Sequence, residues 1–315
     1  MPSVQSVSLS VEVEEVKELF AAGVSLSVND GITTDVLAKG HGLQRCVVFT
    51  LLQTLILNER NQLLVAAAAP HQEAESILLL VEEPELYIHP QLSKLFFDVL
   101  ASFAITDQVI YTTHSPVFVD AYEAERVAIV AKPDVGTGTT LRSCDRTAFD
   151  GLDDRRLFQG FTRMNAAMNE VFFAKRVMLV EGPEDVIGVI ATLKALGLIT
   201  HRPEELEWTV VACGGKEAIP FFQRVLNAFS IPYRVIHDFD ICPGMHPDAE
   251  ANHRRSNDTI AALRRGAQIF QYPVKLEESL GLANHFQDQY SAHVYFSDPA
   301  RITPAVRDLV AQAFT

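Results

Sequence analysis

The chain has 315 residues, which is enough for two domains that each bury a core of their own. A formal net charge of -14 excludes a protein that coats nucleic acid by broad neutralisation of phosphates, so any contact with DNA must be local. The four cysteines form no CxxC pair, which argues against a zinc site or a disulfide framework and favours a reducing, cytoplasmic location. No apolar run approaches the roughly 20 residues that span a bilayer, so we expect no membrane partner.

The first part of the chain predicts a small sheet followed by a strand, a helix and a second strand. Small polar and apolar residues alternate in SVSLSVEVEEV, and SLSVNDGI combines a similar run with an Asp-Gly turn signal. Residues 43–64 predict a long helix. The apolar runs in AESILLLVEEPE and DQVIYTTHSP predict buried parallel strands, and PQLSKLFFDVLASFA between them has helical spacing.

The second part of the chain predicts an α/β domain after a linker. Residues 132–154 are rich in Gly, Thr and Asp and have no sustained period, so we predict a linker over 132–169 between domains at 1–131 and 170–315. Helical segments at 186–198, 217–229 and 254–265 then alternate with strand-like runs, a pattern that predicts a mostly parallel sheet covered by helices, with a helical extension at the C-terminal end. The four strand-like runs are KRVMLVEG, EWTVVACGG, IPYRVIHDFD and GAQIFQYPV.

Two pairs of acidic residues follow predicted strands. In VMLVEGPED the strand delivers Glu181 at its carboxyl end, and Asp185 falls beside it in the first turn of a helix. In YRVIHDFD the period of two along a strand puts Asp238 and Asp240 on one side, whereas His237 points to the opposite face and is expected to be packed. Because carboxyl ends of parallel strands meet at one edge, both pairs are expected to lie together.

Four carboxylates held close together repel one another or take up protons unless cations intervene. Their hard oxygen atoms select Mg²⁺ or Mn²⁺, and we expect two ions. Such ions lower the pKa of a bound water, align it for attack on phosphorus and stabilise the leaving oxygen. The sequence therefore predicts catalytic, metal-binding roles for Glu181, Asp185, Asp238 and Asp240 in phosphodiester hydrolysis.

The motifs LVEGPED, VACGGK and HDFD, in this order at strand ends, resemble those of the Toprim domain over about residues 170–275. In the first part, LAKGHGLQR, ILLLVEEPELYIHP and IYTTHSP resemble the signature loop, Walker B strand and switch histidine of an ABC-type ATPase. The resemblance is to the C-terminal half of such a domain, so residues 1–131 are expected to form a partial ABC-type ATPase domain. That resemblance implies that Glu82 holds the magnesium environment, Glu83 polarises the attacking water and His114 contacts the terminal phosphate. It also implies that Gly40 and Gly42 belong to the signature loop.

An ABC-type segment followed by Toprim resembles the OLD (overcoming lysogenisation defect) family of ATP-dependent nucleases. The resemblance implies a divalent-metal-dependent DNA endonuclease or nickase, a homodimer, and a role in phage defence. The sequence has no GxxxxGK[ST] loop, and Ala38 stands where the signature loop ordinarily has serine. We therefore expect ATP to bind only if another chain supplies that loop, as a separate chain carrying the N-terminal ATPase half would.

Several residues have a structural alternative. Asp185 has the alternative of acting as a helix cap without binding metal. Lys216, which follows the Gly214–Gly215 turn, is expected to be a solvated residue at a helix start rather than a phosphate contact. Glu277 is a further candidate metal ligand, but it and Glu278 also suit the start of a helix electrostatically.

A second function also stays open at the level of sequence. The absent phosphate loop, Ala38, and the lack of any lysine after Lys275, where the family carries a late one, fit a regulatory or assembly subunit that binds DNA or a partner without cleaving. A Toprim primase or topoisomerase is disfavoured, because neither a zinc-binding module nor a separate breakage domain accompanies the motifs. An ATPase acting alone is disfavoured by the missing phosphate loop.

Overall fold

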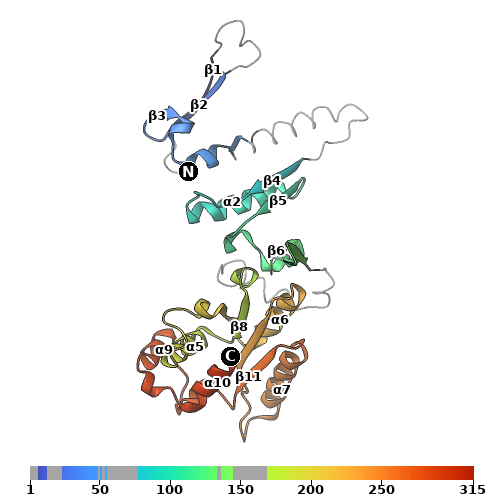
Figure 1. Cartoon of the computed structure of the whole chain (residues 1–315), viewed down its shortest axis with the longest axis vertical. Helices are drawn as coiled ribbons and strands as arrows, with labels where there is room; N and C mark the ends of the chain where they lie inside the picture. Colours follow the sequence, from blue (N-terminus) through green and yellow to red (C-terminus); the bar gives the residue numbers. More distant parts are fainter. Residues whose placement is uncertain are drawn as a thin grey trace. The chain divides into compact units, whose positions relative to one another are not determined.

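The computed structural model describes residues 6–12, 23–48, 50–51, 54, 77–132, 136–144 and 169–315. The chain divides into two compact units, Met1–Phe118 and Val119–Thr315 (Figure 1). No helix in these described stretches is long and apolar enough to cross a membrane.

The first unit opens with an antiparallel sheet of β1 (Ser6–Glu12), β2 (Gly23–Asn29) and β3 (Thr33–Asp35), which confirms the two predicted strands. The Asp-Gly signal marks the turn after β2, where Gly31 has a φ of 118°. A short 3-10 helix, η1 (Val36–Ala38), follows, and residues 41–48 are helical. The predicted helix at 43–64 is thus confirmed at its start, whereas most of it lies outside the described residues.

The strand–helix–strand unit is present as predicted. The parallel strands β4 (Leu78–Glu82) and β5 (Gln108–Thr112) are joined through α2 (Pro90–Phe103), and η2 (Pro116–Phe118) follows. Phe96 and Leu100 of α2 pack with Phe118 in a small core. The expectation that these strands are buried on both faces is wrong in the described part of the chain. Leu80 in β4 is 66% exposed, because α2 covers only the other face of this two-stranded sheet.

Part of the predicted linker is structured. After η3 (Ala121–Arg126), strand β6 (Ala128–Ala131) pairs antiparallel with β7 (Thr140–Ser143), which lies inside the stretch predicted as linker. Val127, Ile129 and Cys144 pack against the core of the second unit. The prediction of a structureless segment over 132–154 is therefore wrong at β7, whose four residues are too few to give a recognisable period. Residues 133–135 and 145–168 lie outside the described residues, and the domain limits stay a prediction.

The second unit is built on a four-stranded sheet in which every neighbouring pair is parallel, with the order β11-β10-β8-β9. Its strands match the four predicted runs, so the predicted α/β fold is confirmed. The strands are β8 (Arg176–Val180), β9 (Trp208–Ala212), β10 (Tyr233–Asp238) and β11 (Gln268–Tyr272).

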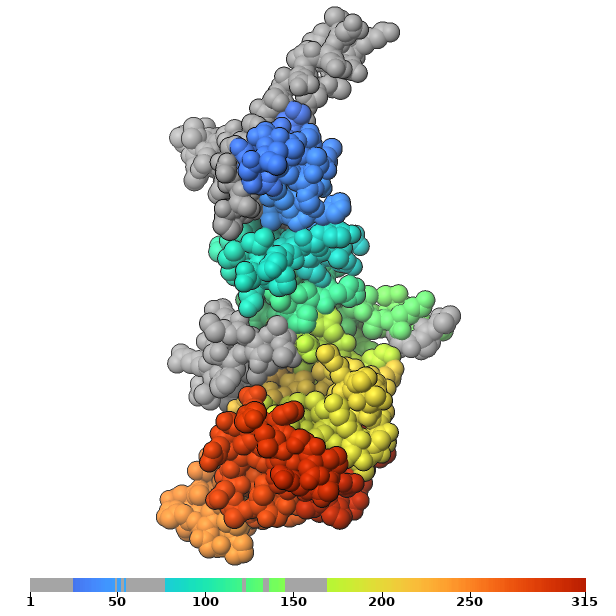
Figure 2. All heavy atoms as spheres, turned by 90° about the vertical axis from the view of Figure 1, so that its left-hand side faces the viewer, coloured from blue at the N-terminus to red at the C-terminus, as the bar shows by residue number. Residues whose placement is uncertain are grey.

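Helices cover both faces of this sheet. Val177 and Leu179 of β8 face a core shared with α6 and α7, whereas Met178 and Val180 face a second core shared with α5, α9 and α10. The C-terminal segment lies beside α5 on the second face (Figure 2). The α-helices are α5 (Pro183–Ala195), α6 (Ile219–Ala228), α7 (Pro247–Ala262), α8 (Leu276–Ser279), α9 (Gln289–Phe296) and α10 (Pro304–Phe314). The 3-10 helices are η5 (Glu170–Phe172), η6 (Pro203–Leu206), η7 (Lys216–Ala218) and η8 (Pro299–Arg301).

Candidate metal centre

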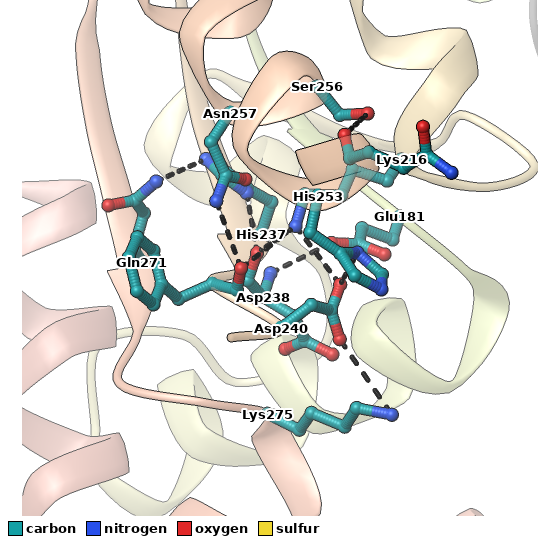
Figure 3. Close-up of polar contacts among 12 residues, drawn as sticks. Glu181, Lys216, His237, Asp238, Asp240, His253, Ser256, Asn257, Gln271 and Lys275 are labelled. Atoms are coloured by element: carbon teal, nitrogen blue, oxygen red, sulfur yellow. Dashed lines mark hydrogen bonds and ion pairs between the residues drawn. The ribbon is translucent and has the colours of Figure 1, made fainter. Parts of the chain in front are cut away.

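Three carboxylates converge at the carboxyl edge of the parallel sheet. Glu181 follows β8, and Asp238 ends the neighbouring strand β10, so the parallel pairing brings the two together. One oxygen atom from each of Glu181, Asp238 and Asp240 lies within 4.8 Å of the other two (Figure 3). Three carboxylate oxygens at this spacing form a set of hard ligands for a divalent cation.

Backbone N–H groups orient two of these carboxylates. Glu181 Oε1 accepts a hydrogen bond from the Asp238 amide at 2.8 Å, and Asp238 Oδ1 accepts one from the Leu276 amide at 3.0 Å. Each of these two side chains is therefore anchored through one oxygen, and its other oxygen remains available for a ligand.

Asp240 reaches the cluster by a route that the sequence did not predict. Strand β10 ends at Asp238, so the period-of-two argument for placing Asp240 beside it is wrong. Instead, Asp240 has a φ of 60°, in the left-handed region, and its amide donates to the Val274 carbonyl at 2.9 Å. This turn, rather than the pleat of a strand, directs its carboxylate back towards Asp238.

Three basic side chains surround Asp240. The Nζ atom of Lys216 lies 3.0 Å from Asp240 Oδ2, His253 Nδ1 lies 3.8 Å from the same oxygen, and Lys275 Nζ lies 3.7 Å from Oδ1. The expectation of a solvated Lys216 is wrong, because its side chain is only 6% exposed. His253 and Lys275 were not predicted. For His253, the available signal in the sequence was its spacing from Asn257, because residues four apart lie on the same face of a helix such as α7.

Burial and mutual repulsion raise the pKa values of these acids. Burial is the largest cause for Glu181, whose pKa rises to about 7, although the Asp238 amide opposes the shift. Burial, followed by the neighbouring charges of Glu181, Asp185 and Asp240, raises the pKa of Asp238 to about 8. Acids in such surroundings hold a proton near neutral pH unless a cation replaces it, which fits a metal-binding role.

Asp185 lies outside the group of three but close to it. Its Oδ2 accepts a hydrogen bond from the Gly182 amide at 2.8 Å, which is the capping role that the sequence allowed. Burial raises its pKa to about 7, and the charges of Glu181 and Glu277 add to that rise. Glu277 lies in the first turn of α8, as the helix-dipole alternative requires, and its Oε1 accepts a hydrogen bond from the Phe286 amide at 3.2 Å. Metal ligation by Asp185 and Glu277 stays a prediction.

His237 is packed, as predicted, and lies under the site. It is 1% exposed, and its Nε2 lies 3.0 Å from Nε2 of Gln271 in the neighbouring strand. Burial lowers its pKa to about 4, which keeps the imidazole neutral at physiological pH.

The ATPase-like residues of the first unit form a separate group. Glu82 ends β4, and His114 Nε2 lies 3.8 Å from Glu83 Oε1. Gly40 precedes the helix at 41–48 and accepts two of its first amides, while a Cβ on Gly42 would lie 2.5 Å from the carbonyl oxygen of residue 87. This close approach explains a glycine at position 42. The nucleotide contacts expected of these residues stay a prediction.

Comparisons with known proteins agree with this division of the chain. A family model for an AAA ATPase domain matches residues 4–119, and one for the Toprim domain of overcoming lysogenization defect-like proteins matches residues 172–240. The OLD nuclease of Thermus scotoductus is 33% identical over 225 residues, which cover 67% of this chain and 42% of that protein. The Old nuclease of Escherichia phage P2 is 26% identical over 246 residues, which cover 75% of this chain and 39% of that protein.

Among solved structures, the C-terminal region of the Burkholderia pseudomallei OLD protein matches 44% of this chain and 82% of its own length, with 18% identity and a TM-score of 0.28. By the coverages of 42% and 39% given above, the chain spans about two fifths of the length of the two OLD nucleases that it matches. The matches to an AAA ATPase domain and to an OLD-type Toprim domain, together with the similarity to two OLD nucleases, show that the chain belongs to the OLD family.

Proposed function

We propose that this chain is a divalent-metal-dependent nuclease that hydrolyses phosphodiester bonds in DNA, as an endonuclease or nickase. The observation that carries the proposal is the convergence of Glu181, Asp238 and Asp240 oxygens within 4.8 Å at the edge of a parallel sheet. The family supports it, since both relatives are named as OLD nucleases.

The residues present fit a divalent cation. Glu181, Asp238 and Asp240 supply three carboxylate oxygens. The charge of Glu277 contributes to the raised pKa of Asp185, and in this proposal these two acids would be further ligands for a second ion. All are oxygen donors, the ligand type that Mg²⁺ and Mn²⁺ prefer. When bound, such ions supply an activated water and neutralise charge on the phosphate.

The protein's own groups position the reactants. The Asp238 and Leu276 amides hold Glu181 and Asp238 in place, so that little reorganisation is needed when ligands arrive. Lys275, whose side chain is 31% exposed, brings a positive charge to the open side of the cluster. A phosphate that entered from solvent would meet this ammonium, which would stabilise the charge that develops on it.

Nucleotide control by the first unit is part of the proposal. Glu82, Glu83 and His114 would contact ATP in a complex where another chain supplies the phosphate-binding loop, with Gly40 and Gly42 in the signature segment. A homodimer and a role in phage defence are the family-level expectations that accompany this assignment.

A plasmid-nicking assay tests the proposal. The purified chain should convert supercoiled plasmid to the open-circular form with Mg²⁺ or Mn²⁺ but not with EDTA, and Asp238→Ala should abolish this activity. Asp248→Ala is the matched control, because the Asp248 side chain on α7 is 91% exposed, and it should cleave like the unaltered protein. Nicking retained by Asp238→Ala would remove the site assignment. Metal binding without any nicking would favour the non-cleaving subunit instead.

A further inference from the structure

Lys216 is the most deeply buried cation at the site, and the proposed nuclease activity does not use it. It opens η7 directly after the Gly214–Gly215 turn that follows β9. Its Nζ atom donates to the Asp238 carbonyl at 2.6 Å and to Asp240 Oδ2 at 3.0 Å, and lies 3.4 Å from the Phe239 carbonyl (Figure 3). An ammonium has three N–H donors, so these three acceptors use all of them.

The turn after β10 needs such a donor. Asp240 adopts a left-handed backbone conformation, which is unfavourable for a non-glycine residue and persists only where neighbouring contacts impose it. Asp238 is the last residue of β10 and Phe239 lies just beyond it, and buried carbonyls require hydrogen-bond partners. Lys216 donates to both carbonyls. His237 Nδ1 also lies 2.8 Å from the Asp238 carbonyl, and Asn257 Nδ2 on α7 donates to the Phe239 carbonyl at 2.9 Å.

We propose that Lys216 is a positioning residue that fixes the Asp238–Asp240 turn, so that Asp240 offers its Oδ1 atom to a divalent cation while Oδ2 stays bound to the ammonium. The proposal rests on the metal-dependent function above. It assigns to Lys216 a task within the protein rather than contact with phosphate, because its donors are all engaged and its side chain is 6% exposed.

The sign of one measurement separates positioning from simple charge. Coulomb's law alone predicts that removal of a cation beside the site strengthens the binding of a second cation. Positioning predicts the opposite, because a relaxed turn no longer aims Asp240 at the other two carboxylates. Lys216→Met, which keeps the length of the side chain, should therefore weaken Mn²⁺ binding at least tenfold.

Lys275→Met is the matched comparison. Lys275 also faces Asp240, at 3.7 Å, but its ammonium has a second contact with the exposed His285 ring rather than with the turn carbonyls. Its removal should leave Mn²⁺ binding unchanged or tighter. Lys216→Arg should not restore binding, because a planar guanidinium cannot direct three donors at acceptors grouped around one point.

The experiment is Mn²⁺ titration of the full chain by calorimetry, with folding checked by circular dichroism and tryptophan fluorescence. If folded Lys216→Met binds Mn²⁺ as tightly as the unaltered protein, or more tightly, the positioning role is overturned. If this variant does not fold, Asn257→Ala takes its place, since it removes a neutral donor to the same turn. Weaker binding then supports the role, and unchanged binding overturns it.

The proposed function fails by a different result. If the unaltered chain binds no Mn²⁺, or if Asp238→Ala binds it equally well, the metal centre itself is wrong. If the unaltered chain binds and Asp238→Ala does not, but Lys216→Met binds normally, only the inference about Lys216 falls.

Discussion

Of the two lysines beside Asp240, Lys275 is the one whose side chain reaches solvent. Its Nζ atom lies 3.7 Å from Asp240 Oδ1 and 2.8 Å from His285 Nε2, and its side chain is 31% exposed. The three donors of Lys216 are all engaged by the Asp238–Asp240 turn, so none is left for a substrate. In the proposed nuclease, Lys275 is therefore the residue expected to contact a bound phosphate.

Lys275→Met should slow nicking at saturating Mn²⁺ by about 100-fold, the size of effect that follows the loss of one donor to developing negative charge. Single-turnover cleavage measures this rate, and Mn²⁺ titration of the same variant shows that the metal site is retained. Lys194→Met is the control, because Lys194 is exposed near the far end of α5. An unchanged rate for Lys275→Met would assign no role to this charge.

Sequence reasoning found the acidic residues but not the cations. Glu181 and Asp238 follow from apolar strands that end in acids, a local pattern that needs no tertiary information. The burial of Lys216 could not be predicted in this way, because the groups that bind its ammonium come from the end of β10 and the turn after it. Nor does a local pattern show that Asp240 leaves the strand, since this depends on its amide pairing with Val274.

At the scale of elements, α5 and α9 approach closely at Gly188. A Cβ added there would lie 2.9 Å from Cζ of Phe296, and that ring packs against Phe286 and Tyr295, which limits its retreat. Alanine favours a helix by about 1 kcal/mol over glycine, but overpacking a core costs about 1–3 kcal/mol. The fixed position of the ring makes the steric cost the larger effect.

Gly188→Ala should therefore lower the free energy of unfolding of the second unit by about 1 kcal/mol, as the difference between these two effects. Urea unfolding followed by tryptophan fluorescence measures it. A midpoint equal to or above that of the unaltered chain would show that the two helices separate enough to admit the methyl group.

The loop between α5 and β9 is closed by a single carboxylate. Glu205 in η6 accepts hydrogen bonds from the amides of Thr200, His201 and Arg202, and these bonds lower its pKa to about 2. Because the folded pKa lies below the ordinary value of 4.5, the unfolded chain binds more protons in this range. The stability contributed by Glu205 is thus complete above pH 4.5 and is lost as pH falls towards 2.

Glu205→Gln should destabilise the second unit at pH 6, and the difference from the unaltered chain should shrink as pH falls from about 4.5 towards 2. Urea midpoints at several pH values test this. The exposed Glu204→Gln beside it is the control and should show no such trend. A difference that stays constant with pH would mean that the three amide bonds do not depend on the charge of Glu205.

Sequence patterns found the elements that are long and apolar. The central strands of the parallel sheet, β8 and β10, are bracketed by turns and largely buried, so their apolar composition reveals them. The sequence pattern did not predict β7, because this strand has four residues and lies in a Gly- and Thr-rich stretch. Its pairing with β6 is what makes it a strand. The same reasoning overestimated the burial of β4, because the number of layers over a strand is a property of the assembled unit.

At the scale of the whole molecule, the chain contains one tryptophan, and it reports on the second unit alone. Trp208 lies in β9, is 3% exposed and packs between the guanidinium groups of Arg176 and Arg234 and the ring of Phe314. Its fluorescence therefore follows the unfolding of the unit that holds the carboxylates. A signal from the whole chain would mix two transitions, for which a single midpoint is not well defined.

Protons and metal ions compete for the same carboxylates in that unit. The pKa values of Glu181, Asp185 and Asp238 are raised to about 7, 7 and 8 in the folded protein, above 4.5 for Glu and 3.8 for Asp. The folded state therefore binds more protons than the unfolded chain between about pH 4 and 8, so the metal-free unit loses stability as pH rises through that window. A divalent ion that replaces these protons is expected to restore the lost stability.

Mn²⁺ should accordingly stabilise the unit that contains Trp208, and by more at pH 8 than at pH 6. At a free concentration 100 times the dissociation constant, linkage gives about 2.7 kcal/mol. Thermal unfolding followed by Trp208 fluorescence, with Mn²⁺ or with EDTA at both pH values, measures the shift in Tm. Asp238→Ala should lose the stabilisation and Asp248→Ala should keep it. An equal shift at both pH values, or one that survives in Asp238→Ala, would mean that Mn²⁺ acts elsewhere than at the acidic edge of the sheet.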